Sequence, residues 1–304
     1  MQEKTPQEWT TRGDDVVPDD PEARQTLREL VEVAPGVHVA TAALWSTTST
    51  LVVDADGGAL LVDPGVSVAE TAALAATVRD RGWRVAAGFA THAHWDHVLW
   101  HPGFGVVPRW ATARTVEALA HDADAVRAAA DADAPGHDPA LVGALEALAP
   151  GTSWLPPHRH APGGSGHGTP AVRVVEHDAH APGHAALVAQ RVLIAGDMLS
   201  DVEVPLVDVT STDPVGAYRA ALDRLEESAR GTDVLVPGHG SPALGPAAVA
   251  ARFAADRAYL AALERAARDP EHEVVDDRLR RYVAAWHAEQ LDALVSRRAG
   301  PQPG

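Results

Sequence analysis

The sequence predicts a mixed α/β (α+β) fold in which helices cover β-sheets on both outer faces. Three observations support it. Apolar runs typical of strands come first, a single helix pattern follows them, and further strands and helices complete the chain. With 304 residues, the chain is also long enough to bury a substantial core. We therefore expect one large domain with appendages.

The first third of the chain supplies most of the predicted strands. The Asp-Gly step at residues 56–57 separates two apolar runs, which is typical of a hairpin. Ser67 and Glu70 form a capping box for a helix over about 67–81, and Gly82 fits its end. A polar N-terminal extension, residues 1–28, precedes these elements. The expected strands are 30–33, 37–39, 50–54, 59–63 and 85–90.

The remainder of the chain alternates predicted strands and helices. Alanine-rich helix patterns at about 111–132 and 138–148, followed by a Gly- and Pro-rich loop, predict an insertion over about 111–168. We expect a catalytic domain over 29–245, with a C-terminal helical segment, 246–304, packed on it. The apolar faces of that segment favour packing or a dimer surface, so a homodimer is one expectation. Further expected strands are 171–176, 185–189, 191–195 and 234–236, and further helices are 213–229, 245–267 and 273–297.

Composition excludes several functions. The formal charge of −17 disfavours binding to nucleic acid or to anionic membranes, since both require clustered cations. The chain has no cysteine, so it offers neither a thiol nucleophile nor a thiolate metal ligand. Lys4 is the only lysine, which disfavours Schiff-base chemistry. No secretory signal or membrane-spanning stretch is evident, and we expect a cytoplasmic protein acting on a small-molecule substrate.

A cluster of imidazoles and a carboxylate follows the predicted strand at 85–90. It comprises His92, His94, Asp96 and His97. In an extended segment, His92 and His94 project to the same side and can bind one ion. Asp96 and His97 then lie where the chain turns, beside a second ion. Imidazole and carboxylate donors suit zinc and its borderline neighbours.

Three more candidate ligands lie beside glycine at the ends of later strands. His184 follows Pro182-Gly183, Asp197 follows Gly196, and His239 follows Pro237-Gly238. We prefer His184 to the neighbouring His177 and His180 because of the Pro-Gly turn before it. Together with the first cluster, these residues predict a centre for two metal ions, with Asp197 bridging them.

These motifs resemble those of the metallo-β-lactamase superfamily. The resemblance rests on Asp63 in Leu61-Val62-Asp63-Pro64-Gly65, on the segment 92–97, and on the His184, Asp197 and His239 motifs, in the family's order. It implies a four-layer αββα sandwich holding two divalent ions, zinc first, with iron or manganese as alternatives. By motif position, His92, His94 and His184 would hold one ion, and Asp96, His97 and His239 the other. Asp63 would orient the histidine segment from behind.

The resemblance indicates a hydrolase that is not a true β-lactamase. Many true β-lactamases of this fold carry cysteine or serine where this chain has Asp197. We expect a metal-bridging hydroxide to cleave an ester, thioester or lactone of a small molecule, with Asp96 and Asp197 as the catalytic carboxylates. A small-molecule phosphodiesterase, or an iron-dependent dioxygenase with the same ligands, is the alternative. Trp95, Trp100, His101 and Tyr218 are candidates for the substrate pocket.

Overall fold

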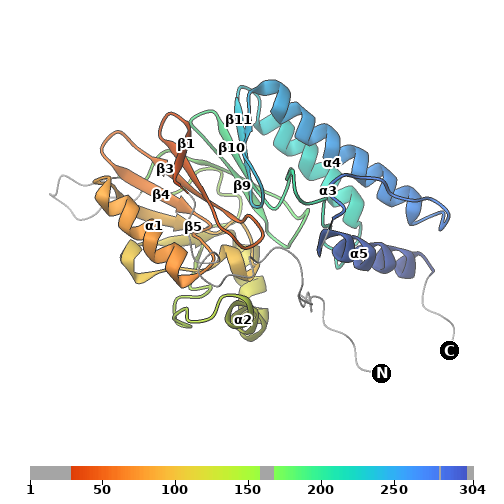
Figure 1. The fold of residues 1–304 in the computed structure, drawn as a ribbon, viewed down its shortest axis with the longest axis horizontal. Helices are drawn as coiled ribbons and strands as arrows, with labels where there is room; N and C mark the ends of the chain where they lie inside the picture. The colour runs from red at the N-terminus through yellow and green to blue at the C-terminus, as the bar shows by residue number, and fades with distance from the viewer. Residues whose placement is uncertain (1–28, 158–167, 281, 300–304) are drawn as a thin grey trace.

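Two β-sheets face each other, with helices on both outer faces (Figure 1). The computed structural model describes residues 29–157, 168–280 and 282–299. The expected N-terminal extension, 1–28, lies outside the described residues. So do His158, His160 and His167 of the Gly- and Pro-rich loop. The layers are those of the expected αββα sandwich.

Seven strands of the described chain form the first sheet, in sequence order. Strands β1 to β4 pair antiparallel, and β4 to β7 pair parallel. The parallel strands therefore end at a common edge, where β5 delivers the histidine segment. The strands are β1 (Val31–Ala34), β2 (Val37–Thr41), β3 (Thr48–Val53), β4 (Gly58–Val62), β5 (Arg84–Phe89), β6 (Arg109–Ala111) and β7 (Glu146–Ala147).

The second sheet has the order β12-β11-β10-β9-β8. Its strands are β8 (Arg173–Glu176), β9 (Ala185–Ala189), β10 (Val192–Gly196), β11 (Val234–Pro237) and β12 (Ala243–Leu244). Strands β10 and β11 are parallel, so Asp197 and His239, which follow them, emerge at the same edge. Apolar side chains of both sheets, such as Leu60, Leu187 and Ile194, interdigitate between the layers.

Helices cover the outer faces through separate apolar clusters. Helix α1 (Val68–Asp80) packs Leu74 and Val78 on Leu51 and Leu61 of the first sheet. The predicted capping box is present at its start, where Ser67 and Glu70 bond each other's backbone N–H groups. Helices α3 (Pro214–Ser228) and α4 (Pro246–Ala266) cover the second sheet, and α5 (Tyr282–Ala299) packs on α4 and on the loop after β10 (Figure 1). Helix α2 (Ala113–Asp133) lies beside the 3₁₀ turn η2 (Trp95–His97).

Two predicted helices are wrong in part. Residues 138–148 are turns and the strand β7, because Gly143 has a positive φ and its N–H donates to the carbonyl of Val98. Pairing with β6 satisfies the backbone there instead of a helix. The last helix begins at Tyr282, since the preceding segment is held by Arg278.

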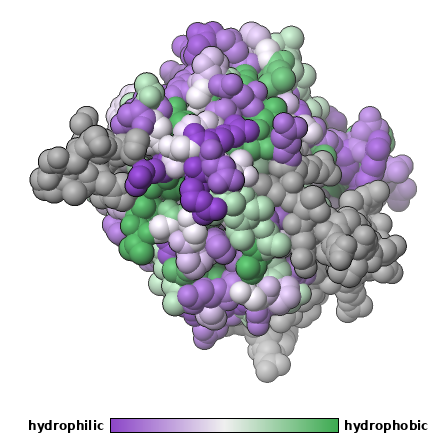
Figure 2. All heavy atoms as spheres, turned by 60° about the vertical axis from the view of Figure 1, so that its left-hand side comes forward, coloured by the Kyte–Doolittle hydropathy of each residue, from purple (hydrophilic) through white to green (hydrophobic). Residues whose placement is uncertain are grey.

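Hydrophilic residues cover much of the face shown in Figure 2, with hydrophobic residues interspersed. Among the residues that the structure describes, no helix is both long and apolar enough to span a membrane. The exposed large hydrophobic residues that lie on strands or helices belong to different elements: Val31 lies on β1, Leu244 on β12 and Val295 on α5. Val106, Trp154 and Val275 are exposed outside these elements.

The Arg278 guanidinium is the main buried cation of the C-terminal segment. It contacts Asp256 of α4 at 2.6 Å, and its side chain is only 7% exposed. Replacing Arg278 with Met removes the partner of a buried carboxylate, which should cost about 3–5 kcal/mol of unfolding free energy in urea denaturation. The matched control, Arg257→Met, removes a more exposed cation paired with Asp223 and should cost less than about 1 kcal/mol. Equal losses in both variants would contradict this account.

Candidate metal centre

The sheet edge gathers candidate metal ligands from four segments of the chain. His92, His94, Asp96 and His97 lie in the segment after β5, of which Trp95–His97 form the 3₁₀ turn η2. His180 comes from the loop between β8 and β9. Asp197 follows β10 directly, and His239 follows β11. The shared strand direction therefore brings donors far apart in sequence to one place.

The first donor group consists of His92, His94, His180 and Asp197. His94 Nδ1 lies 2.9 Å from His92 Nε2 and 3.0 Å from His180 Nε2. Asp197 Oδ2 lies 3.3 Å from His92 Nε2 and 3.5 Å from His180 Nε2. Three nitrogens and one oxygen thus converge on a single point.

The second donor group consists of Asp96, His97 and His239. The Nε2 atoms of His97 and His239 are 3.4 Å apart, and each lies 3.4 Å from Asp96 Oδ2. Asp197 reaches this group as well, with Oδ1 3.1 Å from His97 Nε2 and Oδ2 3.3 Å from His239 Nε2. The Asp197 carboxylate is the contact between the two groups.

These distances fit metal coordination. Ligands at 2.0–2.2 Å from a tetrahedral ion are about 3.3 Å apart, close to the separations in both groups. Asp197 Oδ1 is also buried, and its ion-pair contact with His97 Nε2 lacks hydrogen-bond geometry. The atom therefore has no hydrogen-bond partner among the described residues, a need that a bound cation would satisfy. The donor set contains nitrogen and oxygen only, which suits zinc, iron or manganese.

Asp63 supports the histidine segment from behind, as its motif predicts. Its Oδ1 accepts from the N–H of Thr91 at 2.9 Å, and its Oδ2 accepts from the Thr91 hydroxyl at 2.7 Å. Asp63 Oδ2 also lies 3.0 Å from His97 Nδ1. This contact places the proton of His97 on Nδ1 and turns Nε2 toward the donor group. Asp63 itself has a positive φ of 49°, at the sharp turn after β4.

His239 is oriented by a similar arrangement. Its Nδ1 lies 3.2 Å from the carbonyl of Trp45 and 3.3 Å from the hydroxyl of Thr47. The carbonyl accepts the Nδ1 proton, so that Nε2 points at Asp96 and Asp197. Thr47 also donates to Asp96 Oδ2 at 3.3 Å. The segment between β2 and β3 therefore supports the second group.

Burial and neighbouring charges divide the histidines into two electrostatic classes. Burial holds the pKa of His94 well below its usual value and lowers that of His180 to about 4, so both are neutral near pH 7. Burial also opposes charge on His97 and His239, but the neighbouring carboxylates, Asp197 foremost, together outweigh it. The pKa of His97 is raised well above its usual value, and that of His239 to about 10. Cation binding must displace these two protons.

The structure places His184 behind the first donor group and not within it, which differs from the expected ligand role. The N–H of Asp197 donates to His184 Nε2 at 3.1 Å, and His184 Nδ1 lies 3.2 Å from His177 Nε2. Both ring nitrogens are thus engaged by protein atoms, and His184 stacks behind His92 at 4.9 Å between ring centroids. A Cβ at Gly196 would lie 2.5 Å from His184 Nε2, so this close approach requires glycine.

His180 takes the place that His184 was expected to fill. The N–H of His177 donates to the carbonyl of His184, which closes the loop between β8 and β9. His180 lies near the tip of that loop, midway between the strands, and faces the site. The predicted strands 171–176 and 185–189 could have indicated His180, because the residue midway between two paired strands projects farthest from the sheet. The Pro-Gly turn alone does not distinguish the two histidines.

The four candidate pocket residues lie in different surroundings. Trp95 is buried beside the site and packs against Trp45 of the β2–β3 segment, at 5.5 Å between ring centroids. Trp100 packs with Phe104 in the cluster under α1, away from the donors. His101 begins the 3₁₀ turn η3 (Pro102–Phe104), where its Nδ1 accepts from the Gly103 N–H. The structure therefore brings Trp95 and Tyr218 to the site, and leaves Trp100 and His101 outside it.

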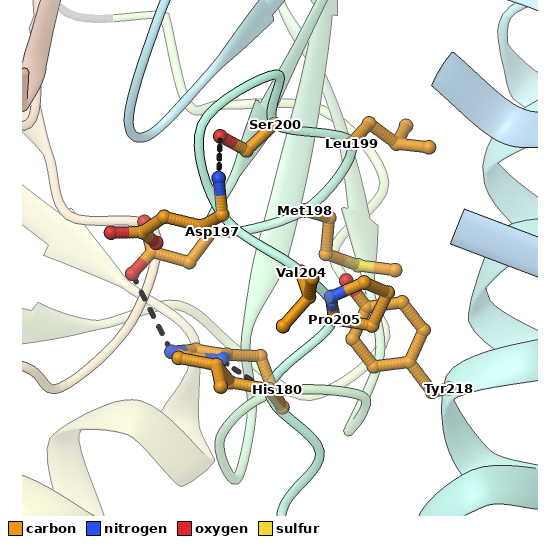
Figure 3. A pocket seen from close by; sticks show the side chains of 10 residues that line it. His180, Asp197, Met198, Leu199, Ser200, Val204, Pro205 and Tyr218 are labelled. Atoms are coloured by element: carbon orange, nitrogen blue, oxygen red, sulfur yellow. Dashed lines mark hydrogen bonds and ion pairs between the residues drawn. The ribbon is translucent and has the colours of Figure 1, made fainter. Parts of the chain in front are cut away.

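A cavity opens beside the first donor group (Figure 3). In this view, the carboxylate of Asp197 and the ring of His180 face each other, and the ring of Tyr218 lies beyond Val204 and Pro205. Glu203 also lines the cavity, and the sequence analysis did not identify it. Burial raises the pKa of its carboxyl to about 7. None of the described residues that line the cavity is arginine or lysine. The lining comprises His180, Asp197, Met198, Leu199, Ser200, Glu203, Val204, Pro205, Leu206 and Tyr218.

Comparison with known families agrees with this geometry. The model of the metallo-β-lactamase superfamily matches residues 43–239, more than half of the chain. The chain belongs to the metallo-β-lactamase superfamily. Members of this superfamily are mostly hydrolases and typically bind divalent metals, and the two donor groups could hold such ions. No curated protein matches the sequence.

Solved structures with the superfamily fold resemble this chain at low sequence identity. The inverting sec-alkylsulfatase Pisa1 from Pseudomonas sp. is 19% identical, with a TM-score of 0.59, and the match covers 90% of this chain and 52% of that one. A metallo-β-lactamase from Hirschia baltica is 18% identical, with a TM-score of 0.51 and coverage of 74% and 96%. One from Pontibacter korlensis is 17% identical, with a TM-score of 0.50 and coverage of 75% and 98%. At these identities, the likeness concerns the fold.

Because His180 lies in the first donor group and His184 lies behind it, replacing each with glutamine should affect the metal content differently. His180→Gln removes a donor of the first group and should reduce the bound metal to less than that of the unaltered protein after dialysis. His184→Gln keeps an acceptor for the Asp197 N–H and should retain the full content. Elemental analysis of both purified variants measures the difference. Metal loss in His184→Gln alone would restore the original assignment.

Proposed function

We propose that this protein is a dinuclear metal-dependent hydrolase that cleaves an ester, thioester or lactone bond of a small molecule. The supporting observation is the pair of donor groups joined by Asp197. Three imidazoles surround one position. Two imidazoles and Asp96 surround the other. Zinc is the proposed ion, because all the donors are imidazole nitrogen or carboxylate oxygen.

The donor set fixes the proposed chemistry. Two divalent ions held in this way would lower the pKa of a coordinated water toward neutrality and stabilise negative charge on the substrate oxygen. The carboxylates of Asp96 and Asp197 are the chain's catalytic groups in this proposal. Neighbouring imidazoles hold the pKa of both carboxyls below the usual range, so each is ionised and available to bind a cation. Asp96 or a metal-bound water would protonate the leaving group.

The surroundings of the donor groups favour a substrate without a second anionic group. The cavity beside the first donor group has room for about one water molecule, so the substrate would lie outside it. Asp197 and Glu203 are the charged residues of its described lining, and none of that lining is cationic. The chain as a whole has a formal charge of −17. A phosphodiester or a sulfate ester would therefore meet more negative charge around the donor groups than an uncharged carboxylic ester, thioester or lactone, and we rank the ester-type bond above the phosphodiester alternative.

The metal-binding role of the bridging carboxylate is open to a direct test. Asp197→Ala removes the contact between the donor groups and should abolish both the full metal content and turnover. His94→Ala should do the same, since it removes a donor from the first group. Elemental analysis and initial rates on the same samples measure both. Full turnover in a variant that has lost its metal would overturn the proposed function.

The bond that is cleaved can be identified with a substrate panel. We expect kcat/KM for uncharged aryl esters, thioesters or lactones to exceed that for a phosphodiester, a secondary alkyl sulfate or a β-lactam by about 100-fold or more, equivalent to about 2.7 kcal/mol. Preference for the phosphodiester would support the first alternative. Oxygen uptake by the iron-loaded protein without hydrolysis of any substrate would support a dioxygenase.

A further inference from the structure

The C-terminal segment lies outside the part of the chain that matches the superfamily, yet it contacts the loop after Asp197. The family match ends at residue 239, whereas α4 and α5 follow it. Between Asp197 and α3, the chain runs without a strand or helix, and residues 198–206 line most of the cavity. A loop at this position needs support from elsewhere to hold a fixed shape.

Gln290 of α5 holds the centre of that loop. Its side chain is 1% exposed. Its Oε1 accepts from the N–H of Val207 at 3.1 Å, and its Nε2 donates to the carbonyl of Pro205 at 3.2 Å. The amide thus binds the backbone on both sides of Leu206, as a neighbouring strand would. Nε2 also lies 2.6 Å from the Tyr259 hydroxyl, which fixes the orientation of the amide.

The residue between these two bonds contacts a metal donor. The carbonyl of Leu206 lies 2.9 Å from Nδ1 of His180. A carbonyl only accepts hydrogen bonds, so the imidazole proton resides on Nδ1, and the lone pair of Nε2 points at His94 and Asp197. The position of one backbone oxygen therefore sets both the tautomer and the direction of His180.

The rest of the loop is held by neighbouring C-terminal residues. Arg278 donates to the carbonyls of Ser200 and Glu203 at 3.2 Å each. Asp256 accepts from the N–H of Leu199 at 3.0 Å. The hydroxyl of Tyr282 donates to Glu203 at 3.3 Å. Gln290 differs from these residues because only its bonds flank the carbonyl that contacts a donor of the centre.

We propose that Gln290 is a positioning residue for His180, acting through the Leu206 carbonyl, and that the C-terminal segment thereby completes the metal centre. Partners behind metal-binding histidines commonly change metal affinity by about 10- to 100-fold when they are replaced. The inference rests on the metal centre of the proposed function, and it is independent of which bond the enzyme cleaves.

The test measures metal affinity, not turnover. Gln290→Met keeps the approximate volume and removes both backbone bonds. We expect the affinity of the full-length apo-protein for one zinc ion to fall about 10-fold or more in competition with a chromophoric chelator. The absorption spectrum of the cobalt-loaded protein should change as well, because the His180 ligand field is disturbed. Arg297→Met is the matched control: on the same helix, Arg297 donates to the carbonyls of Val209 and Ser211, beyond Leu206, and its loss should leave affinity unchanged.

A double-mutant comparison separates positioning from general stability. In a His180→Gln background, Gln290→Met should cause no further loss of zinc affinity, since its effect passes through His180. An equal additional loss in that background would overturn the proposal, as would unchanged affinity in Gln290→Met. If Gln290→Met does not fold, Gln290→Glu, which places a carboxylate oxygen opposite the Pro205 carbonyl, takes its place. Failure of both variants to fold would assign Gln290 to the core and overturn the proposal. Absence of zinc binding by the unaltered protein would instead contradict the proposed function.

Discussion

The carboxylate of Asp197 is the contact on which the rest of the site depends. It lies within 3.5 Å of donor nitrogens from four histidines, drawn from both groups. Its Oδ2 contacts imidazoles of both groups and its Oδ1 contacts His97, so one short side chain joins the two groups. Its position follows from the register of β10 and β11, whose parallel pairing brings Gly196 beside Pro237. A Cβ on Gly238 would approach Asp197 Oδ1 to 2.0 Å, so glycine is required there.

Polar contacts behind the imidazoles compensate for the burial of these polar groups. His97 rests on Asp63, His239 on the Trp45 carbonyl, and His180 on the Leu206 carbonyl. Each support accepts or faces the proton on Nδ1 and leaves Nε2 directed inward. The supports come from three separate elements: the turn after β4, the β2–β3 segment and the loop after β10. The centre is therefore a property of the whole sandwich.

The same geometry separates what the superfamily shares from what belongs to this chain. The candidate donors lie at strand ends, and their positions follow from the fold that the superfamily shares. The cavity wall lies within the residues that match the superfamily, whereas its supports from α4 and α5 lie beyond residue 239. Selectivity for a substrate would reside in that second part, because site chemistry is carried by the fold and specificity by the elements added to it.

The sequence by itself determined most of the strands, the capping box of α1 and six of the seven members of the two candidate donor groups, because hydrophobic periodicity and strand-end motifs are local. It did not determine that His180 replaces His184, since the choice depends on how β8 and β9 pair and which imidazole is left at the loop tip. Nor did it place β7, where residues with helix propensity pair with β6 instead. Glu203 and Gln290 carry no motif at all. Their surroundings arise only when α5 packs on the loop after Asp197, a long-range contact that no local pattern records.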